Sequence, residues 1–480
     1  MTATLLFSII IAYFILLLII SFFTGKNANN ESFFLGNKKS PWFIVAFGMI
    51  GTSLSGVTFI SVPGWVGTSQ FTYMQMVVGY FFGYLIIANV LMPLYYKLNL
   101  TSIYSYLEQR FGFWSYKVGA TFFIVSRTFG AAARLYLVAI VLQLIVFEEW
   151  NIPFWLTVVI TILLIWLYTF RGGIKTIIWT DTLQTLFMLL AVGISIYLIS
   201  KKMEYSLIEA ISKIFDSKYS QIFVFDDWRA KNFFPKHFFG GVFIAIAMTG
   251  LDQDMMQKNL SCRNISEAKK NMYWFSIILI FVNLIFLSLG ALLYLYAQKF
   301  AIELPVRSDE IFPFIATKLN LSPVLSIFFT IGLVAAAYSS ADSALTALTT
   351  SFTVDILGKQ KSSEKELKNT RIKVHIFFSV VLAIVIILLN ILNNRSVIDI
   401  IFVVAGYTYG PLLGIYAFGL LTQYQVKDKF VPLIAIVSPI LCFLISSISE
   451  DLFFGYKFGF ELLIMNGFFT FVGFLIIRKK

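Results

Sequence analysis

Long apolar stretches recur along the whole chain and are separated by shorter polar segments. Each stretch is long enough to cross roughly 30 Å of hydrocarbon as a helix. The stretches cover residues 4–23, 42–64, 73–96, 118–146, 153–170, 176–200, 237–257, 271–298, 323–350, 372–393, 397–421, 430–448 and 459–477. The first stretch lacks the charged leading segment and the cleavage site of a signal peptide, so we expect it to be retained. The pattern predicts an all-α integral membrane protein with about 13 transmembrane helices.

The composition agrees with a chain that lies mostly in lipid. Hydrophobic residues make up 59% of it and charged residues only 13%, too little charge to cover a soluble domain. The net charge of +12 does not indicate a nucleic-acid partner, because the basic residues lie between apolar stretches rather than in one patch. The two cysteines, Cys262 and Cys442, lie in different segments, which excludes a disulfide framework. The expected partner of the surface is therefore the lipid bilayer.

The positions of the basic residues predict an orientation in the membrane. With the N-terminus outside and the C-terminus in the cytoplasm, 23 Lys and Arg residues fall in cytoplasmic segments and 12 outside. Of those 12, 7 lie in the long segment 201–236, and long loops weigh little in this rule. We therefore expect an inner (plasma) membrane protein with its N-terminus outside.

Two of the apolar stretches carry signs of a broken helix. The stretch at 42–64 contains Gly and small hydroxyl residues from Gly48 to Thr58, and the stretch at 237–257 contains Gly240, Gly241 and Gly250. Such residues let a helix unwind where its backbone lines a cavity. With the first stretch set aside, both become the first helix of a five-helix half, which is typical of a transporter binding site. For either stretch alone, close helix packing through small residues explains the pattern equally well.

Several motifs in a fixed order resemble the sodium:solute symporter family. The most specific ones are Arg-Gly-Gly-Ile at 171–174 leading to Trp-Thr-Asp-Thr-Leu-Gln at 179–184, and Ala-Ala-Tyr-Ser-Ser-Ala-Asp-Ser at 336–343. Supporting matches lie at 106–112, at 250–253 with Gln257, and at 410–414. The resemblance covers nearly the whole chain. Each motif is weak alone, and their joint order and spacing make the resemblance specific.

The resemblance implies one transporter domain over residues 1–480, with a LeuT-type five-plus-five inverted repeat. The implied parts are an extra N-terminal helix and loop (1–41), the first repeat (42–200), an extracytoplasmic loop (201–236), the second repeat (237–421) and two C-terminal helices (422–480). It also implies that sodium drives the import of a small solute by alternating access.

One face of the stretch at 323–350 carries oxygen donors. Residues 336, 339, 340 and 343 follow helical spacing, so three hydroxyls share a face. Neutral oxygens suit an alkali cation, whereas a single membrane serine more often bonds back to its own helix. The resemblance places the family's common sodium site on Gly51, Leu54, Ala336, Ser339 and Ser340. Members of the family often have Ala where this chain has Gly51, a change that a carbonyl donor tolerates.

Asp181 is a carboxylate inside an apolar stretch, which usually marks an ion path. The alternative is a structural bond to Thr180 or to a neighbouring helix. In family members with a second sodium site, the matching Asp joins residues that correspond to Ser339, Asp342 and Ser343. Asp342 departs from that pattern, because a hydroxyl is commoner there. Two adjacent carboxylates either bind a cation tightly or share a proton, so the cofactor is one sodium ion, with a second ion left open between sodium and a proton.

Arg134 is flanked by small residues inside the stretch at 118–146. A guanidinium favours planar, bidentate contact with a carboxylate, and an Arg at this place resembles family members that transport acids such as sialic acid. The alternative is a structural ion pair with Asp181 or Asp252. Arg127, seven residues earlier, is expected to extend toward the inner surface of the membrane.

Further substrate contacts are implied by the resemblance at Ser55 and Thr58 and, more weakly, at Gln75. The prediction is a sodium-coupled symporter for a small anionic solute: an organic acid, or a carboxylate-bearing sugar or amino acid. The alternatives are a transporter of a neutral sugar or polyol, and a nutrient sensor, which would need a signalling domain that we do not expect. An intramembrane enzyme is disfavoured because no nucleophile–base pair or HExxH motif occurs, and a channel because filter-like repeats are lacking. No obligate protein partner is inferred.

Overall fold

The computed structural model describes residues 3–26, 28–170, 172–319, 321–392 and 397–479. Arg171, the first residue of the Arg-Gly-Gly-Ile motif, lies outside the described residues. The helices are α1 (Ala3–Gly25), α2 (Asn30–Leu35), α3 (Trp42–Ser69), α4 (Tyr73–Ile86), α5 (Met92–Lys97), α6 (Ser105–Arg110), α7 (Phe113–Leu142), α8 (Phe154–Thr169), α9 (Ile174–Lys202), α10 (Leu207–Phe215), α11 (Phe234–Ala245), α12 (Gln253–Leu260), α13 (Ile265–Lys299), α14 (Ser308–Pro313), α15 (Pro323–Ser351), α16 (Glu364–Leu392), α17 (Val397–Leu421), α18 (Val431–Ser447), α19 (Ser449–Leu452) and α20 (Leu462–Ile476).

The all-helical membrane architecture is confirmed. Within the described residues, ten helices are long and apolar enough to cross a membrane, and the bent pair α11–α12 makes an eleventh. Helices α8 and α20 are apolar but shorter, at 16 and 15 residues. Every predicted apolar stretch coincides with one of these helices, whereas the count of 13 crossings stays a prediction.

Both predicted helix breaks are present. In α3 the backbone leaves the helical conformation at Ser55, with φ 57° and ψ 175°. This conformation is normally reserved for glycine, and a non-glycine residue is held there only by its surroundings. Helix α11 ends in a π-helical stretch, Ile246–Gly250, and α12 leaves it at an angle of 65°. The Asp252 side chain then caps α12 by accepting from the backbone N–H groups of Asp254 and Met255.

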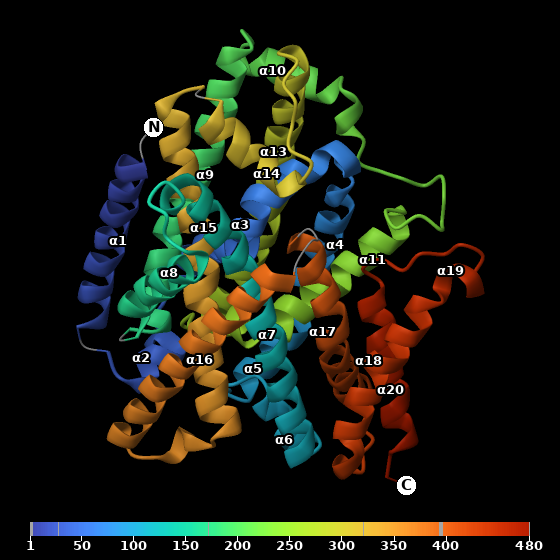
Figure 1. Cartoon of the computed structure of the whole chain (residues 1–480). Helices are drawn as coiled ribbons and strands as arrows, with labels where there is room; N and C mark the ends of the chain where they lie inside the picture. The colour runs from blue at the N-terminus through green and yellow to red at the C-terminus, as the bar shows by residue number, and fades with distance from the viewer. Residues whose placement is uncertain (1–2, 27, 171, 320, 393–396, 480) are drawn as a thin grey trace.

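The two broken helices lie in the middle of the bundle. Figure 1 shows α3 and α7 near its centre, α1 on one flank, and α18 and α20 on the other. Helix α15 packs against α9, α3 and α7, and α12 packs against α15, α3 and α9. Residues far apart in the sequence therefore meet where α3, α9, α12 and α15 converge.

Candidate functional site

A cavity with both polar and apolar side chains in its wall lies beside the break in α3. Its walls come from α3, α4, α7, α11, α13 and α17, and it has a volume of about 90 Å³. Ser55 and Thr58 line it from the broken helix, Arg127 and Arg134 line it from α7, and tyrosines of α4 close one side. The structure therefore brings Ser55, Thr58 and Arg134 to one cavity, as the sequence predicted for a shared binding site.

Arg134 is partly buried in the wall of this cavity. As far as the chain is described, its guanidinium forms no hydrogen bond or ion pair. In this conformation Arg134 therefore does not form the alternative structural ion pair with Asp181 or Asp252. A guanidinium that lies beside a cavity and has no protein partner is free to bind an anionic group of a solute.

Arg127 does not extend to the membrane surface, so that prediction is wrong. Its side chain is 4% exposed, forms an ion pair with Asp254, and lies 3.9 Å from Asp252 (Nη1 to Oδ2). The bend between α11 and α12 brings both carboxylates to the depth of Arg127, and a buried pair replaces contact with water. The hydroxyl of Tyr409 on α17 also donates a hydrogen bond to Asp252.

Gln75 lies outside the cavity wall. Its amide nitrogen donates to the carbonyl of Asn232 at 2.9 Å, and its amide oxygen accepts from the backbone N–H of Val224 at 3.2 Å. The side chain is fully buried. Gln75 therefore fastens the loop 201–236 to α4, and the structure does not bring it to the predicted substrate contacts.

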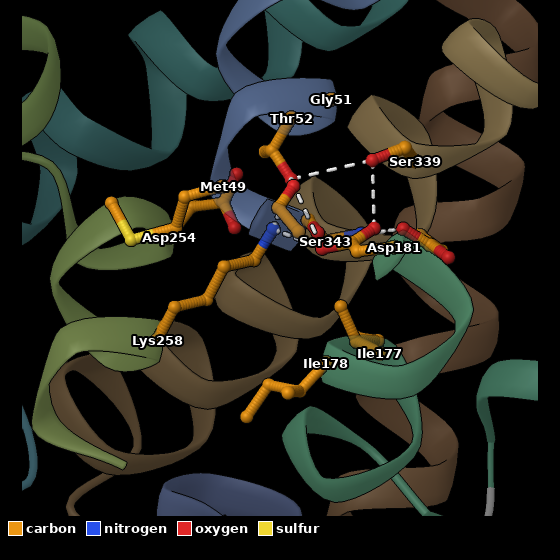
Figure 2. A network of polar contacts seen from close by, with 12 residues as sticks. Met49, Gly51, Thr52, Ile177, Ile178, Asp181, Asp254, Lys258, Ser339 and Ser343 are labelled. Carbon is orange, nitrogen blue, oxygen red and sulfur yellow. Dashed lines mark hydrogen bonds and ion pairs between the residues drawn. The ribbon is translucent and has the colours of Figure 1, made fainter. Parts of the chain in front are cut away.

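A second polar cluster lies on the other side of the α3 break, and Figure 2 shows it from close by. Asp181 of α9 accepts a hydrogen bond from the hydroxyl of Ser339 on α15 at 2.7 Å and one from Thr52 on α3 at 3.0 Å. The hydroxyls of Thr52 and Ser339 are 3.3 Å apart. Asp181 therefore bonds neighbouring helices, while lying among the hydroxyls expected of a cation site.

The predicted sodium-site residues of α3 and α15 face each other. Ser340 donates to the carbonyl of Thr52 at 3.4 Å, and Leu54 and Ala336 are both buried nearby on the same two helices. Gly51 packs directly on Thr185 of α9, so a Cβ atom added to Gly51 would lie 2.3 Å from the Thr185 hydroxyl oxygen. The departure from Ala at this position therefore has a local cause, because the Thr185 side chain occupies the space of a methyl group.

Asp342 and Ser343 continue the same face of α15. Asp342 is fully buried and accepts a hydrogen bond from the hydroxyl of Tyr168 at 2.9 Å. The Ser343 hydroxyl is also buried and has no hydrogen-bond partner in the described part of the chain. A buried hydroxyl without a partner is expensive, and a bound cation would satisfy its oxygen.

Lys258 was missed as a site residue. Its ammonium group donates to Asp181 at 2.5 Å (Nζ to Oδ2) and to the hydroxyl of Thr52, and the residue is 1% exposed. The sequence pattern ends the apolar stretch at residue 257, which places Lys258 among the 23 cytoplasmic Lys and Arg residues. Helix α12 instead continues to Leu260, which carries Lys258 into the core. In the sequence, the feature that points to Lys258 as a site residue is its position one residue after the motif that ends at Gln257.

Broken helices that meet at a cavity lined by arginines and hydroxyls, beside buried carboxylates, are typical of secondary transporters. The chain belongs to the sodium:solute symporter family, whose sequence profile matches residues 33–425. The protein is accordingly a sodium-coupled symporter.

Relatives over nearly the full length carry related names. The chain is 26% identical over 460 residues to the sodium/sialic acid symporter NanT of Aliivibrio fischeri, covering 94% of this chain and 89% of that protein. It is 25% identical over 463 residues to the sodium/sialic acid symporter SiaT of Proteus mirabilis, covering 93% and 90%.

Solved structures show the same fold. A Na⁺-coupled sialic acid symporter in a substrate-bound outward-open state matches with a TM-score of 0.84 and 21% identity, over 99% of this chain and 98% of that chain. A nucleobase-cation-symport-1 family transporter, Mhp1, in a closed conformation matches with a TM-score of 0.57 and 14% identity, over 94% of each chain.

Proposed function

We propose that this sodium-coupled symporter carries a small organic acid and that Arg134 binds the carboxylate of that acid. The observation that carries the proposal is the Arg134 guanidinium in the cavity wall, without a partner within the described residues. An arginine at membrane depth is costly and calls for an anionic partner. Ser55 and Thr58 line the same cavity and would contribute hydroxyl contacts.

Sialic acid is the first solute to test, because two relatives that cover most of the chain are named as sodium/sialic acid symporters. It combines a carboxylate with several hydroxyl groups, which suits one guanidinium beside Ser55, Thr58 and the cavity tyrosines. A neutral sugar or polyol would leave Arg134 without a counter-charge in a desolvated site.

We assign the coupling ions to the two predicted oxygen sites. Sodium would bind between the break in α3 and α15, at Gly51, Leu54, Ala336, Ser339 and Ser340. A second cation, sodium or a proton, would bind at Asp181, Asp342 and Ser343. The facing of α3 and α15 at Thr52 and Ser340, and the unpartnered hydroxyl of Ser343, support these assignments.

We further propose 13 membrane crossings, with two inverted repeats at 42–200 and 237–421 and the C-terminus in the cytoplasm. An odd number of crossings is supported by the ends of the chain, because α1 begins near the end of the bundle that α10 covers, whereas α20 ends at the opposite end (Figure 1).

A second cavity of about 430 Å³ indicates the route of the solute. It lies next to the central one and shares Tyr73 and Ile244 with it. Since its wall includes loop residue Lys231, the solute would enter from the side of that loop.

Binding to the purified protein in sodium tests the role of Arg134. Losing a charged hydrogen bond in a dry site costs about 1.5–3 kcal/mol, so Arg134→Ala should weaken sialic acid binding roughly ten- to hundredfold. Arg134→Lys should also weaken it, because a point charge does not replace the planar fork. The wild type should reject the methyl ester of the acid.

The matched control is Arg229→Ala, which removes an exposed loop arginine and should leave binding unchanged. If Arg134→Ala binds the acid as tightly as the wild type, or if the true solute is a neutral sugar, Arg134 is structural and the proposal fails.

A further inference from the structure

The ammonium of Lys258 lies beside Asp181, one of the ligands of the proposed second cation site. It comes from α12 and reaches both Thr52 on α3 and Asp181 on α9. Figure 2 shows the amine pointing at these two oxygens, with Met49, Ile177 and Ile178 around it. These apolar side chains are buried, so the positive charge is satisfied by the protein rather than by water.

Three charged side chains belong to this cluster, which we define as Asp181, Asp342 and Lys258. Asp342 lies three residues after Ser339 on α15, and so on the face that bonds Asp181. Asp342 lies within electrostatic reach of both Asp181 and Lys258. With all three groups charged, the cluster carries one net negative charge.

A further carboxylate, Asp254, is drawn in the same view and does not change this charge count (Figure 2). Asp254 lies four residues before Lys258 on α12, but it is paired with Arg127 on the side of the central cavity. Two carboxylates and one ammonium therefore face each other in a buried space. An uncompensated charge in such a space is strongly unfavourable, so one net negative charge creates a demand for one further cation.

We propose that Lys258 is a tethered counter-cation that cancels the charge of its ion-pair partner Asp181, so that the charge of Asp342 is left for one mobile sodium ion in the second site. The inference rests on the proposed second cation site and adds what sets its stoichiometry. Lys258 stays in the protein through the transport cycle, whereas the sodium ion enters and leaves. The unpartnered hydroxyl of Ser343 is the ligand that this sodium would gain in addition to the carboxylates.

Two single variants should change the number of bound sodium ions in opposite directions, and their combination should leave that number unchanged. Asp342→Ser leaves Asp181 and Lys258 as a balanced pair, so the cluster should lose its sodium ion. Lys258→Met leaves two uncompensated carboxylates, so the cluster should take one more. The double variant Lys258→Met with Asp342→Ser carries one net negative charge again and should bind as many sodium ions as the wild type.

The experiment counts ²²Na⁺ bound per purified protein without any solute, at constant ionic strength kept with choline chloride. Without solute in the assay, the result does not depend on which acid is transported. We expect Asp342→Ser to bind one sodium fewer than the wild type and the double variant to regain it. Lys258→Arg, which keeps the charge, should bind the wild-type number.

Equal sodium counts in Asp342→Ser and the double variant would overturn the proposal, because the Lys258 charge would then have no effect on the ion count. If Lys258→Met alone does not fold, this comparison still decides, because neither of its two proteins has an uncompensated pair of carboxylates. A wild type that binds no sodium would overturn the proposed cation sites and this role of Lys258 with them. A wild type that binds sodium but no acid would overturn only the proposed solute.

Discussion

The buried pair between Lys258 and Asp181 allows a double-mutant cycle whose size follows from the geometry. Asp181→Asn removes the charge that faces an ammonium 2.5 Å away, in a place where both side chains are almost fully buried. Breaking a buried ion pair by removing one partner costs about 3–5 kcal/mol, because the other charge is left unpaired. Lys258→Met should be destabilising for the same reason.

Replacing both partners should cost much less than the two single changes added together. A buried pair exchanged for neutral groups of similar size is often close to neutral in stability. The assay is the apparent melting temperature of the detergent-solubilised protein at a fixed scan rate, in choline without sodium, where each single variant should melt several degrees lower. Additive effects in the double variant would show that the two residues do not interact and would refute the assignment of the pair.

Two further predictions concern the first sodium site. Ser340→Ala should raise the sodium concentration needed for half-maximal uptake while leaving the fold intact, and sodium dependence that stays unchanged in Ser339→Ala and Ser340→Ala alike would remove both from the ligand set. Gly51→Ala should destabilise the protein by about 1–3 kcal/mol, because its methyl group would lie 2.3 Å from the Thr185 hydroxyl oxygen. Adding Thr185→Ala should restore most of the lost thermal stability, and a double variant no more stable than Gly51→Ala would contradict the steric explanation.

The features predicted correctly from the sequence are those that depend on local composition. Apolar stretches reveal membrane helices because lipid demands length and hydrophobicity from each one separately. The break near Ser55 was visible because glycines and small hydroxyl residues gather around it. The common face of Ala336, Ser339 and Ser340 follows from helical spacing alone.

The missed features depend on which helices meet. The sequence pattern predicts both Lys258 and Arg127 toward the membrane surface, whereas the bend before α12 carries Lys258 to Asp181 and brings Asp254 to Arg127. No local pattern contains that bend angle. Gln75 was assigned to the solute, yet its amide is used by loop residues about 150 positions later in the chain, a contact that only the tertiary structure reveals.

A sodium gradient should drive a carboxylate-bearing solute through the cavity at Arg134. The most direct test is uptake of radiolabelled sialic acid into proteoliposomes that hold the purified protein, with an inward sodium gradient or an equal potassium gradient. We expect accumulation only with sodium, inhibition by excess unlabelled acid but not by its methyl ester, and little or no accumulation in Arg134→Ala. Accumulation that is equal in potassium, or that is undiminished in Arg134→Ala, would contradict it.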